Sequence, residues 1–105
     1  MEPPPKVFQS FCDLYWGMST PLMHTLWAAF RQAESSAART LRHVWLLYDS
    51  VDRIDPKALI HVTCSPKRVL EAIEALVDES LLDRRQATQV EEIILSHVQA
   101  DGTWR

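Results

Sequence analysis

Residues 37–54 read AARTLRHVWLLYDSVDRI, and this stretch decides the fold. Apolar side chains recur in it every three or four residues and form one face of a helix, consisting of Ala38, Leu41, Val44, Trp45, Tyr48 and Val51. Leu46, Leu47 and Ile54 extend the apolar character around much of the circumference. A helix that is apolar on most sides belongs in the middle of a bundle. Asp55-Pro56 ends it, because the residue before a proline disfavours helical geometry. We therefore expect a central apolar helix over residues 37–54.

The same spacing predicts further helices on both sides of this one. Apolar residues at helical intervals predict helices over residues 6–17, from residue 21 to about 32–35, over 66–79 and over 84–98. Residues 57–64 are ambiguous between a short helix and an extended connector, and we favour a helical turn. With only two glycines and 47% hydrophobic residues, the chain suits long helices better than turn-rich β structure. The sequence predicts an all-α fold, a compact bundle of about five to six helices around the central one.

Three of these helices carry start signals, and one carries a stop signal. Ser19-Thr20-Pro21 combines a hydroxyl that can cap the helix with a proline at the first helical position, and Ser65-Pro66 repeats this signal. Asp83 followed by Gln86 resembles a capping box, in which each side chain bonds the other residue's amide. Gly17 is placed to end the first helix in the left-handed conformation.

Length and charge limit the class of protein. At 105 residues the chain forms one domain, expected over residues 6–105 behind a disordered or extended proline-rich lead at residues 1–5, with Gly102 closing the ordered part. A net charge of −3 argues against direct nucleic-acid binding, which needs a basic surface. No run approaches the roughly 18 apolar residues of a membrane span, and no signal peptide is recognisable. These features leave the nucleus or the cytoplasm as the expected compartment.

The sequence lacks the motifs of enzyme chemistry. Cys12 and Cys64 have no metal-ligand spacing, so we expect reduced thiols, with a single disulfide as the alternative. The four histidines fall on four separate predicted elements, so a metal site would need a tertiary coincidence. We find no nucleophile with a base, no paired carboxylates and no glycine-rich phosphate loop. We expect no enzyme, no cofactor and no metal.

Two groups of side chains allow more than one interpretation. Acidic residues on the last two helices could form a cation site or an acidic partner face, but a solvated outer surface is the simpler interpretation. These acidic residues are Glu71, Glu74, Asp78, Glu79, Glu91 and Glu92. Trp27 and Trp45 are expected in the core, whereas Trp16 and Trp104 are less constrained and could instead mark a peptide-binding groove.

Residues 46–53, LLYDSVDR, are the most informative for function. Here acidic residues interrupt the helix that is expected to be most buried. An aspartate close to a core has to be paired, hydrogen-bonded or placed on a functional edge. Asp49 and Arg53 stand four residues apart, so a helical ion pair between them is possible, and a plain surface salt bridge is the alternative.

These eight residues resemble the pattern Y-x-L-D-S-[IV]-x-[KR] of the CTD-interacting domain (CID) family. That family consists of all-helical modules that bind the phosphorylated heptad-repeat tail of RNA polymerase II. Residues 21–33 are similar to its third helix, residues 39–44 to the approach to its fourth, and residues 69–80 and 84–98 to later helices. The resemblance implies a right-handed superhelix. It also implies that Asp49 accepts a hydrogen bond from the heptad tyrosine, that Arg53 is the basic residue following it, and that Leu46 lines the groove.

The chain departs from the family in two respects. The family's first helix and its loop have no counterpart, so the chain resembles a shortened member. Glu91 and Glu92 stand near the position where the family commonly has an arginine, and a carboxylate repels phosphate. This second difference argues against phosphoserine reading by the last helix.

The sequence therefore predicts a CID-like peptide-binding module that acts through Leu46, Asp49 and Arg53 in transcription or RNA 3′-end processing. Its expected partner is a protein or peptide, with the phosphorylated polymerase tail as the candidate. The alternative is a structural or assembly subunit whose apolar faces are completed by a partner protein or by a second copy. An enzyme whose site forms only by tertiary convergence is the third interpretation.

Overall fold

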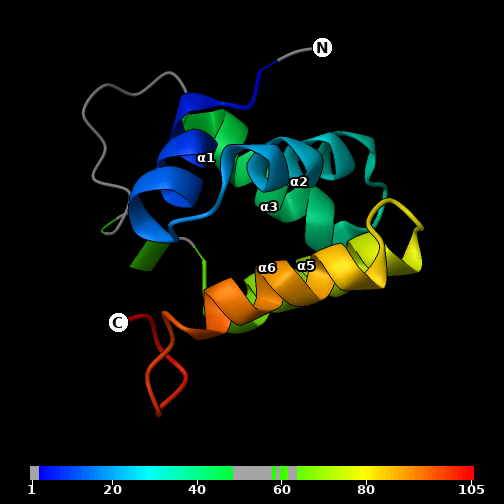
Figure 1. Cartoon of the computed structure of the whole chain (residues 1–105). Coiled ribbons are helices and arrows are strands. Elements are labelled where there is room, and N and C mark those ends of the chain that lie inside the picture. Colours follow the sequence, from blue (N-terminus) through cyan, green and yellow to red (C-terminus); the bar gives the residue numbers. More distant parts are fainter. Residues whose placement is uncertain (1–2, 49–57, 59, 62–63) are drawn as a thin grey trace.

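The helices follow one another along the chain much as the sequence predicts. The computed structural model describes residues 3–48, 58, 60, 61 and 64–105. Its α-helices are α1 (Lys6–Ser10), α2 (Thr20–Gln32), α3 (Ser36–Tyr48), α5 (Pro66–Asp78) and α6 (Arg84–Leu95), and a π-helical turn, η1 (Phe11–Tyr15), follows α1 directly (Figure 1). Within the 57–64 connector, residues 58, 60 and 61 are helical, which supports the favoured helical turn, and Cys64 is not helical. No β-strand occurs in the described part, so the all-α prediction is confirmed.

The helices form two groups that pack against each other. Helices α1, α2 and α3 lie on one side, and the α5–α6 hairpin lies on the other (Figure 1). Helix α5 packs against both α3 and α6, and α3 also contacts α1 and α2. The Cα radius of gyration is 12.6 Å, close to the roughly 13 Å expected for a compact domain of about 100 residues. The described helices thus form one compact all-α globule, and none of them is long and apolar enough to cross a membrane.

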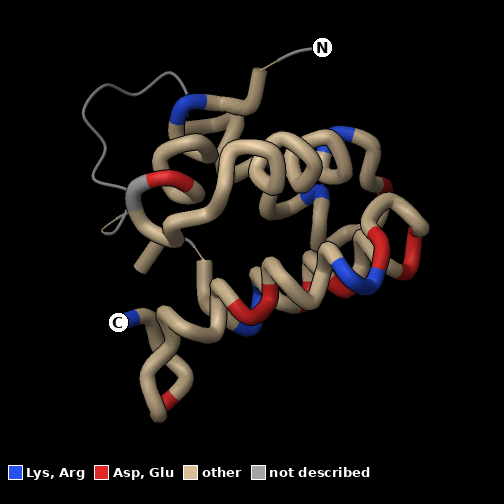
Figure 2. The backbone as a smooth tube through the Cα atoms, viewed as in Figure 1, with Lys and Arg blue, Asp and Glu red and all other residues tan. Residues whose placement is uncertain are grey.

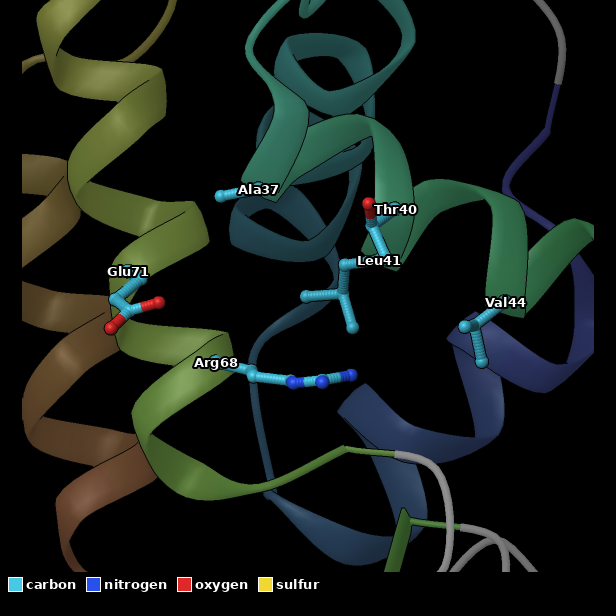
Figure 3. Close-up of a pocket in the computed structure, with 6 residues that line it drawn as sticks. All are labelled: Ala37, Thr40, Leu41, Val44, Arg68 and Glu71. Carbon is cyan, nitrogen blue, oxygen red and sulfur yellow. The ribbon is translucent and has the colours of Figure 1, made fainter.

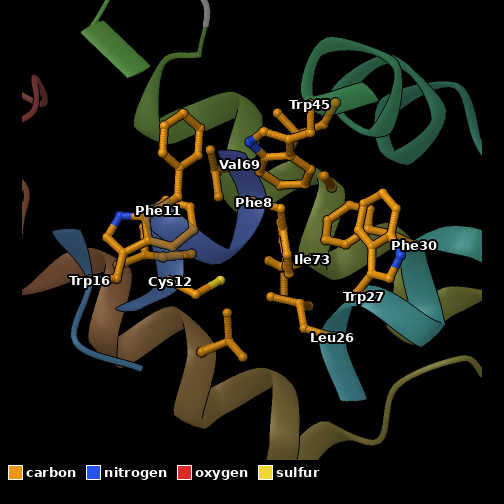
Figure 4. Close-up of a cluster of buried hydrophobic side chains, with 14 of the residues drawn as sticks. Phe8, Phe11, Cys12, Trp16, Leu26, Trp27, Phe30, Trp45, Val69 and Ile73 are labelled. Atoms are coloured by element: carbon orange, nitrogen blue, oxygen red, sulfur yellow. The ribbon is translucent and has the colours of Figure 1, made fainter. Parts of the chain in front are cut away.

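The first helical segment supplies much of the deepest core. Phe8, Phe11 and Cys12 are fully buried, and Figure 4 shows them surrounded by aromatic side chains from α2 and α3. The ring of Phe8 lies 4.8 Å from that of Trp45 and 5.1 Å from that of Trp27. Such offset and edge-on arrangements are the favoured geometries of aromatic pairs. This segment therefore ties α2 and α3 together.

The segment is predicted as one regular helix over residues 6–17, but its second half widens. In η1 the amide of Trp16 donates to the carbonyl of Phe11, five residues back, at 2.8 Å. The amide of Met18 donates to the carbonyl of Cys12 at 2.7 Å. Gly17 between them has a φ of +66°, so its predicted role as a left-handed stop is confirmed. The wider turn accommodates one extra residue before the chain reverses.

Helix α3 is buried on fewer sides than the sequence predicts. It spans Ser36–Tyr48, and the remainder of the predicted 37–54 helix lies outside the described residues. Its buried side chains are Ala38, Leu41 and Trp45, which share one face. Leu46 and Leu47 project away from that face and are 49% and 59% exposed. The expectation that α3 is embedded on most sides is thus wrong, because α1, η1 and α5 supply the core volume that the sequence analysis assigned to it.

All three predicted helix starts are confirmed, and two of the three predicted capping hydrogen bonds form. The Asp83–Gln86 capping box is present, with the Gln86 amide 2.7 Å from Asp83 Oδ1 and the Asp83 amide 3.4 Å from Gln86 Oε1. Ser65 Oγ accepts from an amide of the first turn of α5 at 3.3 Å. Ser19 also precedes its helix, but its side chain forms no cap hydrogen bond. Helix α2 begins without that predicted contribution.

Both ends of the described chain pack more closely than the sequence predicts. Pro4 and Pro5, placed in the disordered or extended lead, are buried, and Gln9 Nε2 donates to the Pro4 carbonyl at 2.7 Å. The prediction that Gly102 closes the ordered part is wrong. Trp104, two residues later, is buried, and its Nε1 donates to the Cys64 carbonyl at 2.7 Å. The residues around Trp104 could not reveal this contact, because its partner lies 40 residues earlier in the sequence.

Candidate functional site

Of the three predicted site residues, the structure places one. Leu46 lies in the last turn of α3, half exposed. Asp49 and Arg53 lie outside the described residues, so the polar edge of the predicted site stays a prediction. The candidate site is therefore built outward from Leu46.

Leu46 is at one end of a hollow of about 570 Å³ on the exposed side of α3. The lining is mixed in character, with apolar Val44 and Leu46 beside the imidazole of His43 and charged groups of both signs. The charged residues are Glu34, Arg39 and Arg42. Within the described residues, no hydrogen bond or ion pair engages the Arg39 side chain. The hollow thus offers apolar contact and an available positive charge together.

A second, smaller hollow of about 220 Å³ lies between α3 and α5, and Figure 3 shows its lining. Leu41 and Val44 approach from α3, and the Arg68 side chain extends from α5 across the hollow toward them. Thr40 and Val44 line both hollows, so the two adjoin along α3. We call the surface that comprises both hollows the α3 strip.

Arg68 is a residue of the α3 strip that the sequence analysis missed. Like Arg39, its guanidinium makes no ion pair within the described part of the chain. A signal for it exists in the sequence. Lys67 and Arg68 stand in the first turn of α5, where the positive end of the helix dipole disfavours cations, and no acidic residue offsets them there. Cations at such a position indicate a role other than helix stability.

Two contacts hold α3 in place. Arg42 Nη1 donates to three carbonyls at the end of α2, those of Phe30, Arg31 and Ala33, at 2.8, 3.0 and 3.2 Å. A cation there satisfies carbonyls left open by the helix end and complements its dipole. The junction between α2 and α3 is in this way fixed by a side chain of α3 itself.

The second contact comes from the end of α5. The Glu79 carboxylate accepts from the amides of Glu34 and Ser35, just before α3, at 2.8 and 3.2 Å. These hydrogen bonds, that from Glu34 first, hold the pKa of Glu79 below its usual range. Glu79 thereby holds the end of α5 against the start of α3, and these are the two helices that line the smaller hollow.

The acidic residues predicted to face solvent gather on α5 and α6 (Figure 2). Arg84 binds Glu74 with two hydrogen bonds of 2.7 and 3.0 Å, and its Nη1 lies 3.5 Å from Glu91. Arg84 lowers the pKa of Glu74 to about 2. Burial, together with the neighbouring Glu74 carboxyl, raises the pKa of Glu91 to about 6. This network is an ion-pair cluster between two helices rather than a set of separate surface charges.

The remaining candidates for chemistry are confined to the core. Cys12 and Cys64 form no disulfide and are buried, and burial raises the pKa of the Cys12 thiol, which makes it a poor nucleophile. In the described part of the chain, no three histidine, cysteine or acidic side chains converge to hold a metal ion. Trp16 and Trp104, which the sequence analysis left open as groove residues, are both buried and lie 6.1 Å apart by ring centroid.

The chain was compared with protein-family models, curated proteins and solved structures. None of them matches. The resemblance to the CID family therefore rests on the sequence segments quoted above, and the fold rests on the structure itself.

Proposed function

We propose that this chain is a helical peptide-binding module of the CID type, with its binding surface along the α3 strip. The observation that carries the proposal is that the two hollows adjoin along α3, where they share Thr40 and Val44. The strip ends at Leu46, three residues before Asp49 in the sequence. A peptide lying along the strip would thus run directly into the segment that resembles the CID family.

The candidate ligand is the heptad-repeat tail of RNA polymerase II, bound as a short turn. Leu41, Val44 and Leu46 supply apolar contact for a tyrosine or proline ring. Arg39 and Arg68 supply positive charge that a phosphorylated serine would complement, and the phosphate would have to lie on the arginine side of each hollow, away from the carboxylates of Glu34 and Glu71. These two arginines would take the place of the late-helix arginine that Glu91 and Glu92 replace.

The proposal has further parts that follow from the family likeness. The helices would be ordered as a right-handed superhelix around α3, with Asp49 accepting a hydrogen bond from the heptad tyrosine and Arg53 beside it. The protein would be a binding protein without catalytic groups, cofactor or metal, acting in transcription or RNA 3′-end processing. Its compartment would be the nucleus, with the cytoplasm as the alternative.

Titration of fluorescently labelled two-repeat heptad peptides, with and without phosphoserine, tests this function. We expect saturable binding of at least one form, and Leu46→Asp and Arg68→Glu should each weaken it by about fivefold or more. Leu95→Asp is the matched control, because Leu95 is an exposed leucine on α6, away from the strip. Absence of any shift with every peptide at millimolar concentration would refute the polymerase-tail ligand.

A second function is favoured by one specific observation. Leu46 and Leu47 are adjacent, large and apolar, and both are exposed. Such a pair is also suited to a helical assembly subunit whose surface is completed by a partner protein or a second copy. Light scattering over a wide concentration range separates the two functions, because a second copy would give a mass that rises with concentration and returns to the monomer value in Leu47→Glu.

A further inference from the structure

A separate groove of about 590 Å³ lies on the outer face of the α5–α6 hairpin. Its apolar floor consists of Leu70 and Ala75 from α5 with Leu95 and Val98 from α6 and the turn after it. Three carboxylates and one cation also line it, those of Glu71, Glu74, Asp78 and Lys67, so the acidic groups are in excess. Leu95 is 53% exposed, although it is as large as the leucines of the core. The volume falls within the roughly 300–1,000 Å³ of pockets that bury a ligand or an anchoring side chain.

The groove has an apolar end and an acidic end. Leu70, Glu74 and Asp78 stand four residues apart on one face of α5. Because α6 returns antiparallel to α5, Leu95 and Val98 lie beside Leu70. At a rise of 1.5 Å per residue, Leu70 and Asp78 are separated by about 12 Å, or roughly two helical turns.

The acidic end keeps an excess of negative charge. Both terminal nitrogens of Arg84 donate to Glu74, so that cation is already engaged. Asp78 acts on Arg84 only by longer-range electrostatic attraction, and Glu91 Oε1 lies 3.5 Å from Arg84 Nη1. A ligand that brings its own cations would therefore find unneutralised carboxylates at this end.

We propose that this groove binds an amphipathic helix of a partner protein. Leucine-sized side chains of that helix fill the apolar end between Leu70 and Leu95, and a lysine or arginine about two turns away meets Asp78. Helix-in-groove recognition of this kind uses anchors one and two turns apart. A second copy of this chain fits less well, because the chain has a net charge of −3 and would bring repulsion to an acidic rim. The inference concerns a surface distinct from the α3 strip and does not rest on the function proposed there.

Three labelled synthetic 16-residue helices of matched helix propensity test the proposal against the full chain. The first carries two leucines one turn apart and two lysines two turns further on, the second has glutamates in place of the lysines, and the third has serines in place of the leucines. We expect the first to bind and the other two to bind at least about tenfold more weakly, because charge and apolar contact act together. Equal binding of the first two peptides overturns the proposal.

Variants of the chain locate the binding. Leu95→Asp and Asp78→Lys should each lower the affinity for the lysine-bearing peptide by about fivefold or more. Both positions are exposed, so the fold is expected to persist. Glu92→Lys makes a similar charge change on the side of α6 that faces α2 and should leave affinity unchanged. Leu46→Asp, on the α3 strip, should also leave it unchanged. Undiminished binding in Leu95→Asp and Asp78→Lys, or a dimer of the chain alone that Leu95→Asp abolishes, overturns the proposal.

Discussion

Replacing Trp104 by phenylalanine tests how firmly the last turn of the chain is held to the core. Trp104 is buried beside Tyr15 and Trp16, at 6.1 Å from each ring, and its Nε1 donates to the Cys64 carbonyl at 2.7 Å. The smaller ring leaves roughly 40 Å³ unfilled, which at about 24 cal/mol per Å³ costs about 1 kcal/mol. The lost hydrogen bond costs about 1 kcal/mol more. We expect the free energy of unfolding to fall by about 2 kcal/mol.

Trp45→Phe is the matched control for this change. Trp45 is as deeply buried, with rings of Phe8 and Phe30 at 4.8 and 5.1 Å, but its Nε1 has no hydrogen-bond partner within the described residues. The same substitution there removes ring volume alone, so we expect a loss of about 1 kcal/mol. Urea denaturation followed by far-UV circular dichroism measures both, because that signal does not depend on the replaced indole. Equal losses, or a larger loss at Trp45, would refute the reasoning from the Trp104 hydrogen bond.

Three further predictions concern the contacts between helices. Asp83→Ala removes half of the capping box and should lower the free energy of unfolding by about 1 kcal/mol in urea, with Asp83→Asn largely retaining it; an unchanged midpoint for the alanine variant would contradict this. Arg42→Ala removes three hydrogen bonds to carbonyls at the end of α2 and should lower the free energy of unfolding by about 1.5–3 kcal/mol. Arg42→Lys should recover part of that loss. An alanine variant with unchanged stability would show that the contacts contribute nothing. The pKa of Glu91 is raised to about 6 in the folded protein, so its contribution to stability falls as the pH rises from 4.5 through 6. The pKa of Glu74 is lowered to about 2, so its contribution is lost as the pH falls below 4.5. Thermal unfolding across pH 4–7 should therefore show a decline above pH 4.5 that Glu91→Gln removes, and an identical pH profile in that variant would rule out Glu91 as its source.

Local signals in the sequence predicted the helices well where capping chemistry is explicit. The Asp83–Gln86 pair and Ser65 act within three residues of themselves, so their roles depend little on the rest of the fold. Leu46 and Leu47 show the opposite case. Their apolar character suggested burial, but which apolar face of α3 meets the core is decided by α1, η1 and α5, and helical spacing alone does not reveal that choice.

The candidate site was predictable in part. Leu46 was singled out and lies at the end of the α3 strip, whereas Asp49 and Arg53 lie outside the described residues and stay predictions. Arg68 was missed because it reaches the strip from α5, about 20 residues away in sequence, and only the packing of α5 on α3 brings it there. Its place in the first turn of α5, against the dipole, was the available signal.

The widened turn η1 limits how the length of this segment can change. A π-helical turn amounts to an α-helix that has accepted one additional residue. Deleting one residue from 11–15 would therefore restore regular α-helical spacing, whereas adding a second extra residue in α-helical geometry would rotate everything before it by about 100° relative to everything after it. Phe8 would then leave the rings of Trp27 and Trp45, or Trp16 would leave Trp104. This stretch should therefore tolerate the loss of one residue better than the gain of one, because its turn already holds the one extra residue that a helix can absorb by widening.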